Sequence, residues 1–312
     1  MESIVIAVQV VMPLFMLLSI GFIVRRLNVV SGDGFLEINT LCFKILLPVL
    51  LFKNIESSNL AAALNPRVMI FTAAAQAATT ILVILVIPRI IKDPPQAASC
   101  AQGTFRSNFV AMGIPLVSGL LDADGMAMVS LMSAVAVPGY NVCSVFILEL
   151  LRGGRPPVKR LIRNIVTNPL IIGSTIGTLC LVFNIHPTGI VRKCVNDIAA
   201  SATPVLIICL GGLFNFGSLR NCFKAVAVAT VGRLLVLPAI SLAVAYLVGF
   251  RGSAFLAVTP IFVTPTATAS FAMAKQMGAD GDSAALIILV TTALSLITMA
   301  FWIALTHHLR IW

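Results

Sequence analysis

Two clusters of polar residues interrupt long apolar runs of the chain, and their residue types suit the binding of an anion. Amide and hydroxyl groups supply directional hydrogen bonds, and a guanidinium supplies a positive charge that matches a carboxylate. Proline and glycine in the same clusters disturb regular helix. The residues concerned are Arg106, Asn108, Gly113 and Pro115 in the first cluster, and Thr264, Pro265, Thr266, Thr268 and Ser270 in the second.

Both clusters predict broken helices inside a membrane. Proline lacks an amide hydrogen and clashes with the preceding turn, so we expect the first helix to break or kink before Pro115. Backbone that leaves the helix at membrane depth survives only inside protein or beside a wet cavity. The N-terminal ends of half-helices carry a partial positive charge and attract carboxylates. Two broken helices that cross near the membrane centre would therefore form an anion site.

Several of these residues have a second reading. Proline and threonine can simply kink packed helices, and Arg106 can either bind a carboxylate or bond the carbonyl groups that a break sets free. Asn141, inside the fifth apolar run, can face the same cavity or be packed away. Lys44, near the middle of the second run, needs a partner or a wet cavity. Glu37 lies seven residues earlier on the same helix face, so pairing with Lys44 competes with a role in transport.

The composition places the whole chain in a membrane. Of its 312 residues, 59% are hydrophobic and 10% are charged, whereas a soluble domain carries about 25% charged residues. The net charge of +10 lies mostly between apolar runs, which is typical of membrane topology, and we expect no nucleic-acid partner. The seven cysteines show no CxxC spacing and the three histidines lack partners at ligand spacing, so we expect no metal or cofactor.

Apolar runs of about 20 residues, long enough to cross the hydrocarbon layer, recur along the chain. We predict an all-α membrane protein with ten transmembrane helices, of which the fourth and ninth are broken and cross. The expected spans are residues 4–24, 34–52, 68–91, 96–121, 125–151, 161–183, 190–214, 223–248, 253–277 and 283–307.

Landmark residues recur at an offset of 156 positions, which is half the chain. Gly21 meets Gly177, and Asn108 meets Thr264. Each half has five expected spans, so the second half would enter the membrane inverted, a common plan of secondary transporters. The predicted units are residues 1–152, a basic cytoplasmic connection at 153–163, and residues 164–312.

Basic residues predict the orientation of the chain. With both termini outside, twelve Lys and Arg lie near the cytoplasmic face and six near the outer face. The positive-inside rule favours this arrangement. We therefore expect a multi-pass protein of the plasma membrane with both termini outside.

The segment RSNFVAMGIPL, which begins at Arg106, resembles the fourth-span motif of the auxin efflux carrier family. That family includes plant auxin exporters and bacterial permeases assigned to malate or malonate. The TPTAT segment at residues 264–268, the ten spans and the two five-span halves also fit. The long cytoplasmic loop of many plant members is replaced here by the short basic connection. The chain therefore resembles the compact bacterial permeases of the inner membrane, and auxin itself is disfavoured as the substrate.

The resemblance implies a fold shared with bile-acid symporters and sodium/proton antiporters. A scaffold of spans 1, 2, 6 and 7 would hold a mobile core of spans 3–5 and 8–10, and the core would carry substrate by an elevator-like shift. Two copies would associate through the scaffold. By motif position, Asn108 and the crossover at Thr264 and Thr266 would bind the substrate carboxylate, and Asn141 is similar to a polar fifth-span residue of the family.

These inferences favour a secondary transporter for a small organic anion, driven by a proton gradient or by the membrane potential alone. A sodium-coupled organic anion symporter is a close alternative, and a membrane sensor that does not transport is a third reading. An intramembrane enzyme is disfavoured, because Ala279-Asp-Gly-Asp282 only approaches the GxGD motif and would lie in a turn.

Overall fold

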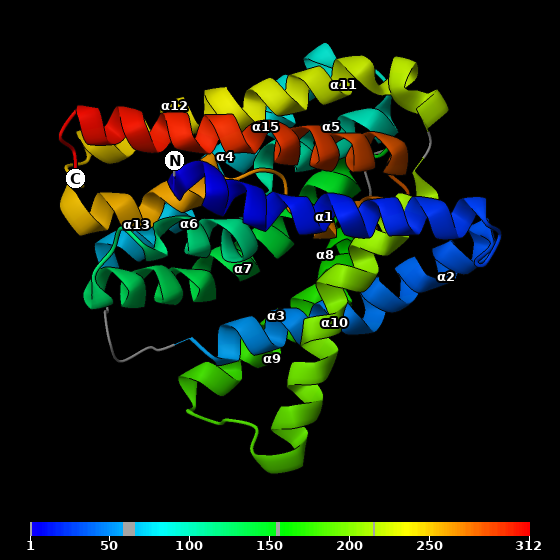
Figure 1. The fold of residues 1–312 in the computed structure, drawn as a ribbon, viewed down its shortest axis with the longest axis horizontal. Coiled ribbons are helices and arrows are strands. Elements are labelled where there is room, and N and C mark those ends of the chain that lie inside the picture. Colours follow the sequence, from blue (N-terminus) through cyan, green and yellow to red (C-terminus); the bar gives the residue numbers. More distant parts are fainter. Residues whose placement is uncertain (1, 59–65, 154–156, 215) are drawn as a thin grey trace.

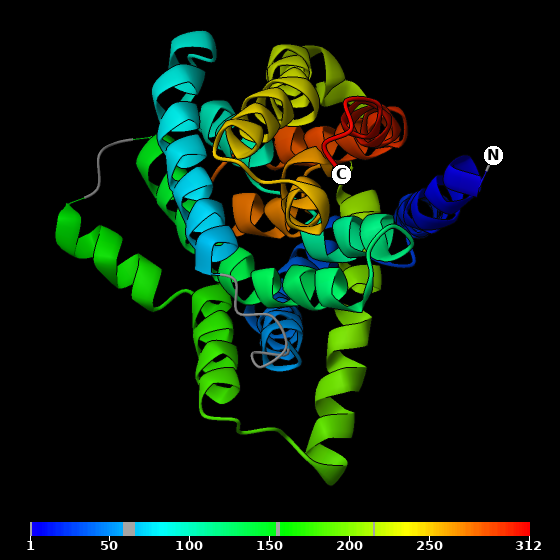
Figure 2. The same ribbon diagram turned by 90° about the vertical axis from the view of Figure 1, so that its left-hand side faces the viewer.

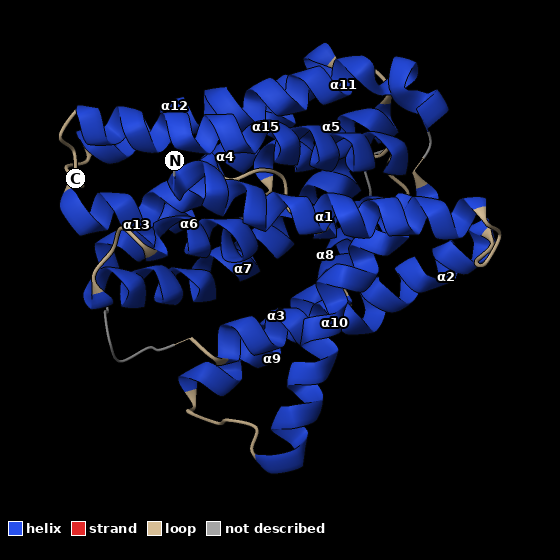
Figure 3. Cartoon of the chain, viewed as in Figure 1, coloured by secondary structure: helices blue, strands red, loops and turns tan. Residues whose placement is uncertain are grey.

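The computed structural model describes residues 2–58, 66–153, 157–214 and 216–312, and these residues form a bundle of helices without strands (Figures 1 and 3). Residues 154–156 of the predicted basic connection at 153–163, which include Arg155, lie outside the described residues. The helices of the first half are α1 (Glu2–Arg26), α2 (Gly32–Leu41), α3 (Leu47–Glu56), α4 (Pro66–Ile90), α5 (Pro94–Phe105), α6 (Ile114–Ser118) and α7 (Ala123–Leu151).

The second half begins with a short helix, α8 (Val158–Val166), that the predicted spans do not contain as a separate element. The remaining helices are α9 (Pro169–Val182), α10 (Gly189–Leu213), α11 (Leu219–Val231), α12 (Leu237–Leu247), α13 (Gly252–Val263), α14 (Ala269–Gln276) and α15 (Gly281–His308), with a 3₁₀ turn at η3 (Phe216–Ser218).

The sixth span differs from the prediction, which placed one helix over residues 161–183. The structure ends α8 at Val166 and starts α9 at Pro169. Asn168 caps the new helix, because its side chain accepts a hydrogen bond from the Leu170 amide at 3.0 Å. Proline suits the first position of a helix and cannot continue the preceding one, so the break falls here.

Six helical segments among the described residues are long and apolar enough to cross a membrane. They are Gly32–Glu56, Pro66–Ile90, Met132–Leu151, Gly189–Leu213, Leu219–Leu247 and Gly281–His308. Shorter apolar helices lie at Phe109–Ser118, Pro169–Val182 and Gly252–Val263. The chain is therefore a helical protein with several membrane-spanning segments, while the count of ten spans stays a prediction.

Three prolines inside helical segments each follow a wide π-helical turn. The turns are η1 (Cys42–Leu46), η2 (Phe109–Gly113) and η4 (Gly232–Val236), and each ends two residues before a proline. Proline has no amide hydrogen, and its ring clashes with the carbonyl four residues earlier. A π turn shifts the bonding partner by one residue and absorbs this clash, so α2 and α3, and likewise α11 and α12, run on as continuous rods.

The helices pack as two groups. The scaffold group comprises α1, α2, α3, α9 and α10, in which α1 packs on α10 and α3 packs on α9 and α10. The core group comprises α4–α7 and α11–α15. One large apolar cluster draws its buried members from these helices other than α14, from the short segments between them and from Ile311 after α15. A second cluster lies between the groups, with Leu47 and Leu206 from one side and Val137 and Phe271 from the other. Figure 2 shows α9 and α10 extending below the core group, with α3 between them.

Glycines let the scaffold helices touch backbone to backbone. A methyl group added at Gly21 would lie 1.9 Å from the carbonyl oxygen of Ile208, and one added at Gly177 would lie 2.9 Å from that of Phe52. The two glycines are 156 positions apart, and so are their two partners. The α1–α10 and α9–α3 contacts are thus made by residues that keep the 156-residue offset.

This geometry predicts that Gly21→Ala and Gly211→Ala each destabilise the protein. A methyl group at Gly211 would lie 2.1 Å from the carbonyl oxygen of Leu18, so α1 and α10 must move apart. Overpacking of this kind costs about 1–3 kcal/mol, and the unfolding temperature of the purified protein should fall. Gly119→Ala is the control, because no atom of the described residues lies within 4 Å of an added methyl group there. Equal stability of the three variants would contradict the close approach of the helices.

Candidate functional site

The two broken helices cross where their chains become extended. Helix α5 ends at Phe105 and α13 ends at Val263. Beyond these ends, Ser107 and Thr266 form an antiparallel bridge. The Asn108 amide donates to the Pro265 carbonyl at 2.8 Å, and the Ala267 amide donates to the Arg106 carbonyl at 3.2 Å. Each segment thus supplies hydrogen-bond partners for backbone groups that the other helix has left free.

The first break lies earlier than the sequence prediction placed it. The chain leaves the helix at Arg106, and Pro115 lies beyond the π turn η2, near the start of α6. The widened turn accommodates Pro115, so the helix continues past this proline without a break. In the second break, Thr264 is extended (φ −78°, ψ 155°), as expected for a residue that precedes a proline.

Hydrogen bonds of three hydroxyl groups hold the crossing together. The hydroxyl oxygens of Ser107 and Thr264 lie 2.5 Å apart. Thr264 also donates to the Pro260 carbonyl at 2.9 Å, and Thr266 donates to the Gly103 carbonyl at 2.6 Å. Buried polar groups of this kind are costly unless they are bonded, and these threonines bond the ends of α5 and α13. They serve the architecture of the crossing and do not line its cavity.

Arg233 joins the C-terminal ends of both broken helices. Its guanidinium donates to the carbonyls of Phe105 at 3.0 Å, Ile261 at 2.9 Å and Thr264 at 2.7 Å. The side chain is 1% exposed. Helix C-termini carry partial negative charge, and one fixed cation offsets both of them. The spacing of charged residues in the sequence does not indicate this role, because the partners of Arg233 are main-chain carbonyls that the fold brings near.

A cavity of about 270 Å³ opens between the crossing and the scaffold group. The chain segments of the crossing that line it include residues 106–111 and 267–269, so the N-terminal ends of η2 and α14 border the space. The polar lining residues are Asn54, Arg106, Ser107, Asn108, Tyr140, Thr203 and Thr268, and none of the described lining residues is acidic. Positive helix ends and a guanidinium favour a negatively charged occupant.

Arg106 is a buried cation with neutral partners. Its side chain is 4% exposed, and its two terminal nitrogens donate to Asn141 Oδ1 at 2.7 Å and to Met273 Sδ at 2.8 Å. Within the described parts of the chain, neither Arg106 nor Arg233 pairs with a carboxylate. A buried charge normally has a compensating partner, so an anion in the cavity would meet a cation that the protein itself leaves uncompensated.

The predicted residues divide into two sets. Arg106, Asn108 and Thr268 line the cavity, and the structure gives the Asn108 side chain no capping bond to η2. The others lie around it. Asn141, Thr264, Pro265 and Thr266 hold the crossing. Ser270 is buried, and its hydroxyl has no hydrogen-bond partner among the described residues. Pro115 is exposed, and a methyl group at Gly113 would lie 2.8 Å from Pro260 Cβ.

Glu37 and Lys44 lie away from the cavity. Both are exposed, and the structure gives no ion pair between these two described residues. The π turn η1 begins between them and changes the helical register on which their expected pairing was based. An exposed lysine in a span can reach toward the membrane surface, which lowers its cost.

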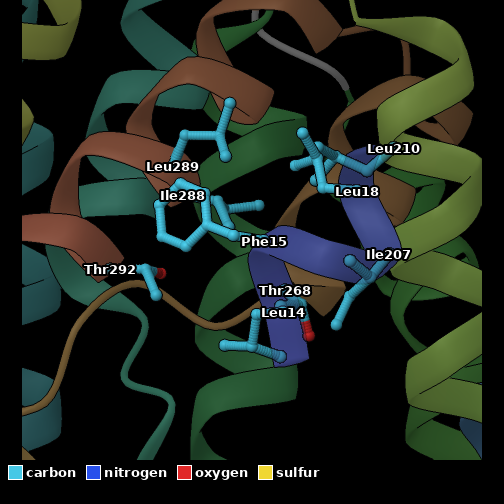
Figure 4. A pocket seen from close by; sticks show the side chains of 9 residues that line it. All are labelled: Leu14, Phe15, Leu18, Ile207, Leu210, Thr268, Ile288, Leu289 and Thr292. Atoms are coloured by element: carbon cyan, nitrogen blue, oxygen red, sulfur yellow. The ribbon is translucent and has the colours of Figure 1, made fainter. Parts of the chain in front are cut away.

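A second, smaller space of about 20 Å³ lies among α1, α10 and α15, on another side of the crossing (Figure 4). Its lining is apolar except for Thr268 and Thr292. Thr268 borders both this space and the larger cavity, so the crossing is a thin partition here. Figure 4 shows Thr268 beside Leu14 and Ile207, at the boundary of the two helix groups.

Four further polar residues line the cavity and were not among the predicted site residues: Asn54, Ser107, Tyr140 and Thr203. Ser107 stands between two predicted residues, so its position was a usable signal. Tyr140 comes from α7, where its hydroxyl donates to the Ile261 carbonyl at 3.1 Å. Asn54 and Thr203 belong to the scaffold helices α3 and α10, and only the packing of the two groups brings them to the crossing.

Several spanning segments, two broken helices and a polar cavity between helix groups define a membrane transporter. The solved structure of the sodium proton antiporter MjNhaP1 from Methanocaldococcus jannaschii has the same fold, with a TM-score of 0.64 and 12% sequence identity over 96% of this chain and 97% of that one. The chain belongs to the membrane transport protein family, the auxin efflux carrier family, whose profile matches residues 6–154 and 156–303.

Two relatives match nearly the full chain. An uncharacterized transporter of Methanothermobacter thermautotrophicus is 22% identical, with 94% of this chain and 96% of the relative aligned. A protein of Rhizobium meliloti, whose designation as a malonate transporter is provisional, is 24% identical, with 93% and 92% aligned. The family resemblance seen in the fourth-span motif is therefore confirmed.

The crossing predicts a severe effect of Arg233→Lys. A lysine ammonium cannot bond three carbonyls in different directions as the guanidinium fork does, and each buried carbonyl left unbonded costs about 1–3 kcal/mol. The unfolding temperature in detergent should fall well below that of the wild type. Arg220→Lys, at an exposed position of α11, is the matched control. Wild-type stability of Arg233→Lys would mean that Arg233 does not hold the crossing.

Proposed function

We propose that this protein is a secondary transporter that carries a small organic anion, such as a mono- or dicarboxylate, across the plasma membrane. The observation that carries the proposal is Arg106, a buried guanidinium with neutral partners at the wall of a polar cavity. Asn108 also lines this cavity, and among the described residues its side chain makes no capping bond to η2, so its amide could bond a carboxylate there. The family and the provisional malonate assignment of one relative agree with this chemistry.

The proposed mechanism is an elevator movement of the core group against the scaffold group. The cavity lies at their boundary, with Asn54 and Thr203 on the scaffold side and Arg106 and Asn108 on the core side. The bonds of Arg233 tie both broken helices to η4, so the crossing can move as one body. A cargo held by such a body would be exposed first to one side of the membrane and then to the other.

The inverted repeat supplies the second state. Residues 1–152 and 164–312 would exchange conformations, and this pairing is supported by the equivalent contacts of Gly21 and Gly177 and by helix bounds that recur near the 156-residue offset. Figure 1 shows that α1 begins and α15 ends toward the same end of the molecule, which agrees with an even number of spans. We further propose that this end faces outward and that two copies associate through the scaffold helices.

The proposed energy source is the membrane potential. Within the described part of the chain, the cavity has no acidic lining residue that could carry a proton beside the cargo. Moving one negative charge across the membrane couples to the potential at about 2.3 kcal/mol per 100 mV. An anion would therefore leave a cell that is negative inside. Coupling to sodium or to protons is tested by the same transport assay, run with and without each gradient.

We predict that malonate raises the unfolding temperature of the purified protein and that Asn108→Ala and Arg106→Gln weaken this effect. A lost hydrogen bond or charged contact changes affinity by roughly 3- to 100-fold, with Arg106→Gln the larger loss. Arg106→Lys should retain part of the binding because it keeps the charge. A panel of acetate, malate and an indole carboxylate defines the substrate class, with an organic cation as the negative control.

Asn221→Ala is the matched control for Asn108→Ala, because Asn221 is exposed on α11, away from the cavity. Uptake or efflux of the stabilising acid is then measured in proteoliposomes. Equal stabilisation of the wild type, Asn108→Ala and Arg106→Gln would show that the anion binds elsewhere. Binding without transport would favour a sensor over a transporter.

A further inference from the structure

Helix α8 (Val158–Val166) stands apart from the bundle. Figure 2 shows it at the left edge of the molecule, between α7 and α9, and these are the helices on which it packs. Helix α7 contains the spanning segment Met132–Leu151, and α9 is one of the shorter apolar helices. A helix that connects two such elements would lie at the membrane surface, at the level of the lipid headgroups.

The two faces of α8 differ sharply. Apolar residues occupy positions 161, 162, 165 and 166, a spacing that gathers them in one stripe. Ile165 packs against the apolar cluster at the boundary of the helix groups. Ile162 and Val166 are 56% and 63% exposed, so the protein covers only one edge of the stripe. Lys159 and Arg163, four residues apart, are exposed beside it.

We propose that α8 is a binding surface for anionic phospholipid, independent of the transport site. An uncovered apolar edge next to basic residues matches a leaflet that is apolar below and negatively charged at its surface. The exposed edge would insert among acyl chains, and the ammonium and guanidinium groups would reach the lipid phosphates. In this arrangement α8 anchors the junction between the two halves of the chain at the membrane surface. The movement of one helix group past the other would act on this junction.

The test uses the full-length protein with Ile162→Trp as a reporter, in vesicles of phosphatidylcholine with or without phosphatidylglycerol. We expect a blue shift of the added tryptophan emission in the anionic vesicles, measured against the parent protein. High salt should reduce the shift, because the attraction is screened. Neutralising the face with Lys159→Gln and Arg163→Gln together should abolish the difference between the two lipids.

The matched control is Arg192→Gln with Lys193→Gln, an exposed basic pair at the start of α10, which should leave the shift intact. Equal emission of the reporter in both lipids would overturn the proposal. A blue shift that depends on the protein-to-lipid ratio and not on lipid charge would also overturn the proposal. That result would mean that the exposed face of α8 binds a second copy of the chain.

A separate observation concerns Ser174, on the scaffold helix α9. Its hydroxyl donates to the Leu170 carbonyl at 2.7 Å, so its oxygen can only accept from Asn141 Nδ2, which lies 2.8 Å away. Asn141 must then turn its Oδ1 toward Arg106. Asn141 and Ser174 are 0% and 2% exposed, so water does not compete for these bonds.

We infer that Ser174 is a positioning residue for anion binding, an inference that rests on the proposed function. The relay from Leu170 to Arg106 crosses from the scaffold group to the core group. It fixes the direction of the Asn141 amide, and this amide orients the guanidinium at the cavity wall. A shift of the core past the scaffold would separate Asn141 from Ser174, so the orientation of Arg106 would differ between the two ends of the movement.

Ser174→Ala should raise the KM for malonate uptake roughly two- to tenfold with little change in kcat, and Ser174→Thr should restore it. Thr178→Ala is the control, because Thr178 makes the same kind of bond within α9, to the Ser174 carbonyl at 2.9 Å. A double-mutant cycle on unfolding temperature is independent of cargo: Ser174→Ala and Asn141→Ala should be non-additive, and Thr178→Ala and Asn141→Ala additive.

Additive effects of Ser174→Ala and Asn141→Ala would overturn the relay, and so would a KM that follows the Thr178→Ala control. If the wild type carries no organic acid while the cycle remains non-additive, the proposed function fails and the relay stands as a contact between the two helix groups.

Discussion

The structure depends on how main-chain groups are bonded where two helices break inside the membrane. The hydrocarbon layer offers no water to bond a free amide or carbonyl, and each such group left unbonded costs several kcal/mol. The crossing meets this constraint in two ways: the extended segments bond one another, and Arg233 bonds three carbonyls from both helices. Because Arg233 lies in η4, the same bonds also attach the crossing to a third helix. The Arg233 side chain thus supplies both the bonds that hold the crossing together and the positive charge that offsets the two helix ends.

This solution decides what the cavity can attract. The negative ends of α5 and α13 are offset by Arg233, while the positive ends of η2 and α14 border open space together with Arg106. The result is a positive cavity without a nearby carboxylate among the described residues. An anion would complete the set of charges, and its departure would restore the imbalance. The charge balance of the cavity would therefore differ between the loaded and the empty carrier, and a carrier needs such a difference if its two states are to behave differently.

The sequence alone predicted the membrane location, the family, the two broken helices and three cavity residues, Arg106, Asn108 and Thr268. These features follow from composition, from proline and glycine, and from a local motif. The exact break at Arg106, the role of Arg233 and the scaffold lining by Asn54 and Thr203 could not be read in this way. They depend on bonds between residues far apart in the chain, such as Arg233 with Phe105. The sequence also does not show the π turn η1. This turn changes the helical register between Glu37 and Lys44, on which a pairing of the two residues would depend.

The glycine contacts of the scaffold have a consequence for the origin of the fold. Gly21 meets Ile208 and Gly177 meets Phe52, so each half supplies one glycine and one partner carbonyl. A half-length chain with a single such glycine would make the same contact twice in a two-fold pair. Two separate copies would then already form the α1–α10 and α9–α3 interfaces. Fusion of duplicated genes would therefore preserve an existing assembly, and later divergence could place Arg106 and Arg233 on different halves.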